Sequence, residues 1–462
     1  MAVVTRMGPP DLMVTFTANS KWPEITANLL PGQTGMDRPD LVNRVFKIKL
    51  KELLADLKTR AFGEQMYAMH VIEYQARGLV HARIITKFTG QSPQQRNEVD
   101  KWIWTILPDK NIANGKLREK VLRFMCHEKC GMFHPSAPCM KTDSKTKRSY
   151  CQKRYPQPFS PVPNLNSKSG RAEYKRLNNG DTEEIQCKNG EDRTAVTTTI
   201  DNRYIVPYNP YLLMKYDAHI CVDIVIDKTV IAYLYQYAYK QADTIRARVV
   251  YGNDEIEAYR SVRYISASEA MWHIFGFRTQ ARTPSVYLLY VHLPNEQPVV
   301  YDEADSVEDR ITKANSAVSD LMRFFGRPAF DEFQSLTFLQ YFEQYSIEQD
   351  QRTTKRRKTI RRNHNNDSDN DDDAVTGHTE CIRDRYRNYI YEKTTFNVSR
   401  IQYMSPDYGE VWYLRLLLLH RPAYSFAALK TVDGTMFETY QLLCATHLGL
   451  VHDVNEYLIS MQ

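Results

Sequence analysis

Apolar positions near the start of the chain follow two different periods. Residues 12–17 form a short apolar run that predicts a buried strand, and residues 38–57 carry apolar side chains at helical spacing. Residues 66–74 and 81–87 alternate between apolar and polar positions and contain β-branched side chains. Because a short segment containing Gly78 separates these two alternating runs, they predict a β-hairpin.

The later part of the chain mixes helical and strand-like patterns. The expected elements are helices at residues 101–124, 230–243 and 412–419 and strands at residues 202–206 and 219–226. A further helix is expected to begin near Ser266, which forms a capping-box pattern with Glu269. No segment of the chain repeats.

Charged residues are separated into two blocks within residues 351–377. A basic run from Lys355 to Arg362 precedes a cluster of aspartates, namely Asp367, Asp369, Asp371, Asp372 and Asp373. Such a segment cannot bury enough apolar surface to fold, so we expect a disordered insertion. The basic run has two interpretations, a nuclear localisation signal or a solvated loop.

Length and composition limit the class of protein. With 462 residues, the chain is long enough for two or three domains. A formal net charge of +6 is compatible with a partner that carries phosphates, but it does not identify one. The apolar run at residues 411–419 is broken by Arg415 and is too short to span a membrane. No P-loop is present: the pair Gly115-Lys116 has Lys110 in place of the first glycine and Leu117 in place of Ser or Thr.

Cysteines cluster in the middle of the chain. His127, Cys130, Cys139 and Cys151 offer four nitrogen or sulfur ligands, a set that suits tetrahedral structural zinc, with Cys126 and His134 as possible substitutes. Eight cysteines in a chain of this size do not indicate a secreted disulfide framework. The cluster therefore has two interpretations, a zinc site or reduced thiols that bind no metal.

The predicted hairpin carries a second candidate site. His81 begins one strand and faces a strand with His70 and Glu73. Residues 81 and 83 share one face of their strand, but position 83 is Arg83, which has no lone pair to offer a metal. His81 and Glu73 are thus either weak ligands of a divalent cation or a structural pair.

A tyrosine-rich helix supplies the candidate nucleophiles. Tyr233, Tyr237 and Lys240 stand at i, i+4 and i+7, so two hydroxyls and an ammonium group share one helical face. A tyrosine oxygen can attack a phosphodiester and form a covalent phosphotyrosine link. The alternative is that these tyrosines pack in the core.

These segments occur in an order that resembles the replication-initiator (Rep) region of Helitron transposases. The matching segments are residues 15–24, 72–83, 137–140, 207–213, 264–270, 292–295 and 413–418, together with His127, Cys130-Gly131, Cys151, Tyr155-Pro156, the Tyr233/Tyr237 helix, Ser405-Pro406 and Glu410. Each motif alone is weak, whereas their joint order is specific and extends over nearly the whole chain.

The resemblance implies an α+β fold. Its core would be an antiparallel five-stranded sheet of the HUH/Rep nuclease type, split by the cysteine-containing insert and followed by a small C-terminal α/β module. The expected parts are residues 11–90 as the first half of the core, 91–165 as the insert, 195–300 as the second half, 301–350 as a helical extension, 351–377 as the disordered insertion and 378–462 as the C-terminal module.

The resemblance also implies cleavage and rejoining of single-stranded DNA with Mg²⁺ or Mn²⁺. Tyr233 and Tyr237 would be the nucleophiles and Lys240 would stabilise phosphate charge. His81 would be the first metal ligand and Glu73 another. Together with the basic run from Lys355 to Arg362, the resemblance makes the nucleus the expected location.

The chain departs from the family pattern at two points. The second metal histidine is replaced by Arg83, and the helicase region that follows in the family is absent from this sequence. Three interpretations remain open. The first is a Rep-type nuclease truncated before the helicase, and the second is a module that binds single-stranded DNA without cutting it. The third is a decayed, inactive transposon remnant with no selected role.

Overall fold

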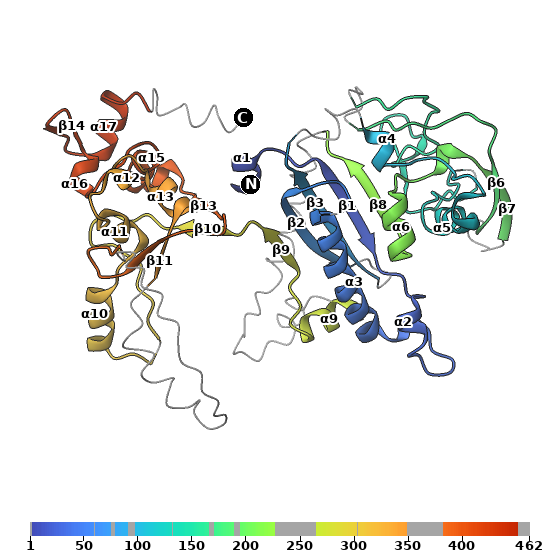
Figure 1. Ribbon diagram of the computed structural model, residues 1–462, viewed down its shortest axis with the longest axis horizontal. Helices are drawn as coiled ribbons and strands as arrows, with labels where there is room; N and C mark the ends of the chain where they lie inside the picture. Colours follow the sequence, from blue (N-terminus) through green and yellow to red (C-terminus); the bar gives the residue numbers. More distant parts are fainter. Residues whose placement is uncertain are drawn as a thin grey trace, which may run out of the picture. The chain divides into compact units, whose positions relative to one another are not determined.

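The computed structural model describes residues 2–59, 61–74, 79–90, 98–131, 133–165, 171–188, 195–226, 265–302, 304–348 and 382–450. The chain divides into two compact units (Figure 1). One unit is Met7–Thr283, and the other combines Met1–Arg6 with Pro284–Gln462.

The first unit is built on a five-stranded antiparallel sheet. The strand order is β8 (Ile220–Ile224), β1 (Leu12–Thr17), β3 (Val80–Phe88), β2 (Gln65–Tyr74) and β9 (Gln280–Thr283). The predicted hairpin is confirmed as β2 paired with β3, and the strands expected at residues 12–17 and 219–226 are confirmed as β1 and β8. The fold is therefore mixed α+β with an antiparallel sheet of five strands, as expected.

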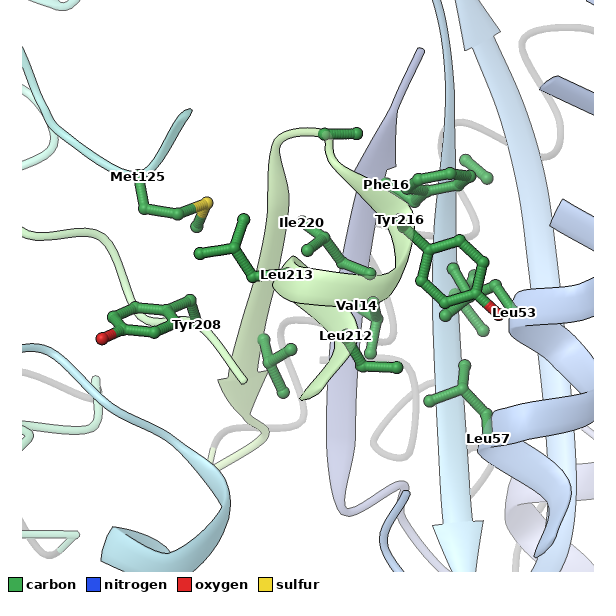
Figure 2. Packing of buried hydrophobic residues seen from close by; sticks show 14 of the residues in the cluster. Val14, Phe16, Leu53, Leu57, Met125, Tyr208, Leu212, Leu213, Tyr216 and Ile220 are labelled. Carbon is green, nitrogen blue, oxygen red and sulfur yellow. The ribbon is translucent and has the colours of Figure 1, made fainter. Parts of the chain in front are cut away.

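Helices cover one face of this sheet because every second strand residue is apolar. α3 (Pro39–Thr59) places Phe46 against Phe16 of β1, with the ring centroids 5.1 Å apart. Tyr216, at the end of α6 (Pro210–Tyr216), meets the same Phe16 ring edge-on, and Figure 2 shows its ring beside Leu53 of α3. Burial of each such ring stabilises the unit by about 2–3 kcal/mol.

Two polar contacts hold the ends of this layer. Ser266 caps α9 (Ala267–Ile274) by accepting a hydrogen bond from the Glu269 amide, which confirms the helix start expected there. Asn43 of α3 donates to the Ser268 carbonyl oxygen at 2.6 Å. α9 is thereby fixed on α3, where its Trp272 is completely buried.

A long insert lies between β3 and β8. Its elements are α4 (Val99–Trp102), η2 (Ile112–Gly115), α5 (Lys116–Phe124), β4 (Met140–Thr142), β5 (Ser149–Cys151), β6 (Glu183–Lys188), β7 (Ala195–Ile200) and η3 (Asn202–Tyr204). β4 pairs with β5, and β6 pairs with β7, in both cases antiparallel.

Two predictions in this insert are wrong. The single helix expected at residues 101–124 is interrupted, because the Trp104 backbone pairs with that of Tyr208 and Pro108 has no N–H for a helix. The strand expected at residues 202–206 is a 3₁₀ turn, since Asp201 caps it and only Ile205 forms a bridge, with Cys126.

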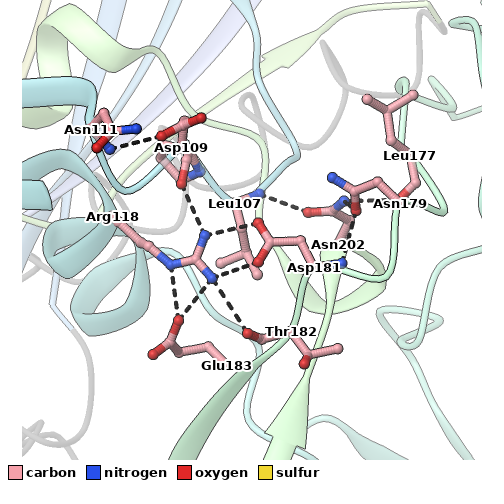
Figure 3. A network of polar contacts seen from close by, with 11 residues as sticks. Leu107, Asp109, Asn111, Arg118, Leu177, Asn179, Asp181, Thr182, Glu183 and Asn202 are labelled. Atoms are coloured by element: carbon pink, nitrogen blue, oxygen red, sulfur yellow. Dashed lines mark hydrogen bonds and ion pairs between the residues drawn. The ribbon is translucent and has the colours of Figure 1, made fainter.

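A charged network joins α5 to the β6 strand of the insert. The buried Arg118 donates to both carboxylate oxygens of Asp181 at 2.8 Å, to Glu183 at 2.9 Å and to the Pro108 carbonyl oxygen at 2.9 Å (Figure 3). These partners raise the pKa of the Arg118 guanidinium above its usual range, so it stays charged despite its burial. A planar fork that satisfies four acceptors makes Arg118 the main polar anchor of α5.

The second unit has its own core of aromatic and leucine side chains. Its elements are α10 (Val307–Ser316), α11 (Asp320–Phe325), α12 (Asp331–Gln334), α13 (Phe338–Gln344), α15 (Glu410–His420), α16 (Phe426–Leu429) and α17 (Tyr440–Thr446), with strands β10 (Val286–Leu289), β11 (Tyr345–Glu348), β12 (Tyr389–Glu392), β13 (Val398–Ile401), β14 (Thr431–Val432) and β15 (Thr435–Met436). The helix expected at residues 412–419 is confirmed as α15, and its Leu414 and Leu417 are fully buried. β10 and β13 pair in parallel, whereas β11 and β12 pair antiparallel.

The remaining short elements lie near the start of the chain and before α15. They are α1 (Ala2–Met7), α2 (Pro23–Thr26), η1 (Gly35–Asp37) and η5 (Pro406–Tyr408). Arg6 of α1 forms an ion pair of 3.0 Å with Glu343 of α13. Within the described ranges, the helices are too short or too polar to cross a membrane.

Two predicted segments lie outside the described residues. One is the helix expected at residues 230–243, with Tyr233, Tyr237 and Lys240, and the other is the charged insertion at residues 351–377.

Candidate functional site

Polar side chains gather on the sheet face opposite α3. The strand register places His219, Thr17, His81 and Glu73 in one row across β8, β1, β3 and β2, and Cys221, Thr15, Arg83 and Val71 in the next row. We call the six residues Thr15, Thr17, Glu73, His81, Arg83 and His219 the polar face. Paired residues of an antiparallel sheet point to the same side, so these side chains share one surface.

Glu73 links the two basic residues of the hairpin. Its Oε2 accepts a hydrogen bond from His81 Nε2 at 2.8 Å, and its Oε1 forms an ion pair with Arg83 Nε at 2.8 Å. Burial raises the pKa of Glu73, but the contacts with His81 and Arg83 outweigh burial and hold it below its usual value. Glu73 is therefore a carboxylate whose two oxygens are both engaged.

This arrangement does not fit a divalent cation. A metal ligand needs a lone pair directed at the ion, but both Glu73 oxygens meet donors and His81 presents its Nε2 hydrogen to Glu73. Arg83 adds a permanent positive charge at the position where a second imidazole was expected. The geometry favours an internal ion pair over Mg²⁺ or Mn²⁺ coordination.

His219 is a residue of this face that sequence reasoning missed. It lies opposite Thr17, whose amide donates to the His219 carbonyl oxygen at 3.0 Å. Burial, followed by the nearby charge of Lys153, lowers the pKa of His219 to about 4, so its imidazole is neutral at neutral pH. No local pattern marks it, because its place beside β1 depends on pairing between distant strands.

The cysteine cluster lies in the same unit. The ligand atoms of His127, Cys130, Cys139 and Cys151 all lie within 4.8 Å of one another. His127 Nε2 is 3.7 Å from the Cys130 sulfur and 3.5 Å from the Cys151 sulfur. These separations are those of ligands around one tetrahedral ion, so the group could bind a metal such as zinc. In the described part of the chain, this is the one His, Cys, Asp or Glu group with such geometry.

Local structure explains how four distant ligands meet. The β4–β5 hairpin pairs Met140 with Cys151 and so brings Cys139 near Cys151. The Tyr155 ring stacks on the His127 ring at 4.3 Å between centroids. Burial and the neighbouring thiols raise the pKa of Cys130 to about 12, because three thiolates so close together are unfavourable without a cation. A zinc ion would remove that penalty. Cys126 and His134 lie outside the group.

The residues of each described candidate site lie close together. His81 and Glu73 meet on the hairpin, and the four candidate metal ligands meet in the insert. Tyr233, Tyr237 and Lys240 lie outside the described residues.

Comparison with known proteins bears on the start of the chain. Residues 1–86 match the family described as "Helitron helicase-like domain at N-terminus". This match contains β1, α3, β2 and nearly all of β3, and with them Glu73, His81 and Arg83. No curated protein matches the chain. The part that carries the polar hairpin is therefore similar to the Helitron N-terminal domain, which supports a Helitron-related protein.

Proposed function

We propose that this chain is a Helitron-type Rep protein, descended from a tyrosine HUH endonuclease, that binds single-stranded DNA on its polar face. The observation that carries the proposal is the contact between His81 and Glu73 on adjacent central strands of a five-stranded antiparallel sheet. It lies within the residues similar to the Helitron N-terminal domain. The net charge of +6 agrees with a polyanionic partner.

Binding is the part of this function that the geometry favours. A bound Mg²⁺ or Mn²⁺ would polarise the scissile phosphate, but the residues of the hairpin do not suit such an ion. Arg83 and Glu73 neutralise each other in part, and Thr15 and Thr17 offer hydroxyl groups on the same surface. Hydroxyls and a guanidinium are common donors to phosphate oxygens.

DNA nicking is a second candidate, favoured by the spacing of Tyr233, Tyr237 and Lys240. In that reaction a tyrosine oxygen bonds to phosphorus, the bond from phosphorus to the 3′-oxygen breaks, and the 3′-oxygen takes a proton. A 5′-phosphotyrosine link remains, and the second tyrosine would serve strand exchange. Lys240 would offset the phosphate charge.

A labelled single-stranded oligonucleotide tests both candidates. We expect the purified protein to bind it with an affinity that falls as salt rises. A covalent adduct that forms with Mn²⁺ and disappears in Tyr233→Phe or Tyr237→Phe would support nicking. Salt-sensitive binding without any adduct would support the binding module, and absence of binding would overturn the proposal.

One variant links the two candidates. Arg83→His restores the imidazole that the family resemblance expects at this position. If the lost histidine is the defect, this variant gains Mn²⁺-dependent adduct formation that the natural protein lacks. An inactive Arg83→His variant that still binds DNA would place the defect elsewhere.

A further inference from the structure

We propose that residues 140–154 bind the backbone of single-stranded DNA, as a contact separate from the polar face. We call this segment the basic hairpin; it consists of β4, β5, the turn between them and the residues that follow β5 up to Arg154. The inference rests on the proposed function for the kind of ligand. It goes further in assigning DNA binding to the insert, to which none of the six polar-face residues belongs except where β8 begins.

The basic hairpin carries most of the net charge of the chain. Six positive side chains minus one carboxylate give it a formal charge of +5, whereas the whole chain has +6. All six cations are exposed, and they are Lys141, Lys145, Lys147, Arg148, Lys153 and Arg154. None of them forms an ion pair with a carboxylate of the described residues. Such a dense group of uncompensated cations attracts a polyanion.

The turn of the basic hairpin is fixed by Asp143. Its Oδ1 accepts hydrogen bonds from the Lys145 amide at 2.9 Å and from the Thr146 amide at 2.7 Å. The Asp143 amide donates to the Arg148 carbonyl oxygen at 2.9 Å, and the Lys147 amide donates to the Asp143 carbonyl oxygen at 3.0 Å. The one carboxylate of the hairpin therefore serves the turn itself, while the cations around it remain exposed to solvent.

The base of the basic hairpin is also fixed. The Gln152 amide donates to the Cys139 carbonyl oxygen at 2.7 Å, and the Arg154 amide donates to the Cys151 carbonyl oxygen at 2.8 Å. Cys139 and Cys151 belong to the group that could bind a metal, so an ion there would hold the two ends of the hairpin together. Because the backbone is already ordered, less conformational entropy is lost when its side chains bind phosphates.

An exposed aromatic ring lies among these cations. The register pairs Lys141 with Tyr150, so their side chains share one side of the hairpin, and Tyr150 is 48% exposed. The bases of a single strand can stack on such a ring. An acidic membrane surface is the other candidate partner, but residues 144–148 at the tip contain no apolar side chain that could enter it. These features favour single-stranded DNA.

The test uses fluorescence anisotropy of a labelled single-stranded oligonucleotide with the full chain over a range of salt concentrations. The site variant is Lys145→Gln/Lys147→Gln/Arg148→Gln. The control variant has the same net charge but loses three exposed lysines of α3 and α5, by Lys51→Gln/Lys58→Gln/Lys116→Gln. We expect the site variant to bind about tenfold more weakly, with a salt slope shallower by about two, since each contact with a single strand contributes about 0.7. The control should keep nearly the natural values.

Tyr150→Ala tests the aromatic ring separately. We expect it to weaken binding about fivefold at every salt concentration, because a stacking contact is lost. Its salt slope should match that of the natural protein, since no charge is removed. An affinity equal to that of the natural protein would contradict the part assigned to Tyr150.

The outcomes separate this inference from the proposed function. Weaker binding by the site variant but not by the control supports the inference. If the natural protein binds DNA and the site variant binds like the control, the inference is wrong while the proposed function stands. If the site variant binds weakly and Arg83→Gln binds normally, the inference stands and the polar face is not the binding surface. No binding by the natural protein would overturn both.

A membrane partner has its own outcome. Vesicles of phosphatidylcholine and phosphatidylserine in equal amounts serve as the probe. A site variant that keeps its affinity for the oligonucleotide and loses only its affinity for these vesicles would overturn the inference.

Discussion

Replacing Glu73 by glutamine should change stability and DNA affinity in opposite directions. Glu73 is 7% exposed, and its oxygens meet His81 and Arg83 at 2.8 Å each. Glutamine keeps the shape and one acceptor but removes the charge that both partners face. Removing one partner of a fully buried ion pair lowers the free energy of unfolding by about 3–5 kcal/mol. Because Arg83 is partly exposed, we expect a smaller loss of about 2 kcal/mol for Glu73→Gln.

The same change should strengthen DNA binding. A phosphate on the far side of the Arg83 guanidinium would lie about 7 Å from the Glu73 carboxylate, where removal of the repulsion gains about 1 kcal/mol, or roughly fivefold in affinity. The gain should shrink as salt rises, since the interaction is partly screened.

Two measurements check this pair of effects. Denaturant unfolding gives the stability change, and anisotropy with a labelled single-stranded oligonucleotide gives the affinity change. Glu119→Gln, an exposed residue of α5, carries the same charge change and should leave both nearly unaltered. A fall in affinity in Glu73→Gln would refute the reasoning, because that result is expected when the carboxylate holds a cation that bridges to DNA.

Three further predictions concern the insert and the sheet. Metal analysis of the purified protein should find about one zinc ion per chain. The Cys139→Ser variant should lose this zinc, whereas the control variant Cys126→Ser should keep it. Natural protein that is kept reduced and contains no zinc would contradict the site. Arg118→Met should lower the free energy of unfolding by about 3 kcal/mol, because two carboxylates lose their partner. Denaturant titration measures this loss, and Arg123→Met, at an exposed position of the same helix, is the control. A loss in Arg118→Met no larger than in the control would contradict the role of the network. Burial, with the charge of Lys47, lowers the pKa of His70 to about 4. The unfolded state therefore binds a proton that the folded state refuses, so stability should fall as pH drops from about 6.5 towards 4. His70→Gln should show a smaller fall over that range, and an identical pH profile would contradict this contribution.

Local patterns predicted the parts of the fold that depend on local chemistry. The alternation in β2 and β3 predicted both strands, because every second side chain of each strand must face α3. The Ser266 cap predicted the start of α9 for a similar reason, since the hydroxyl satisfies an amide three residues away. The four candidate metal ligands were predicted from their residue types and their clustering in the sequence, and the structure brings their ligand atoms together.

The rest depended on distant partners. Residues 103–111 do not continue a helix because Trp104 pairs with Tyr208, more than a hundred positions away. His219 joins the row of His81 only through β1. Neither the spacing of residues nor the composition of a segment predicts contacts between residues so far apart in the sequence.

The most direct test of the central claim is the affinity for single-stranded DNA with and without Mn²⁺. The claim is that the Arg83–Glu73 pair replaces a metal ion on the polar face. It predicts salt-sensitive binding of the same strength in both conditions. Binding that appears only when Mn²⁺ is added would contradict it.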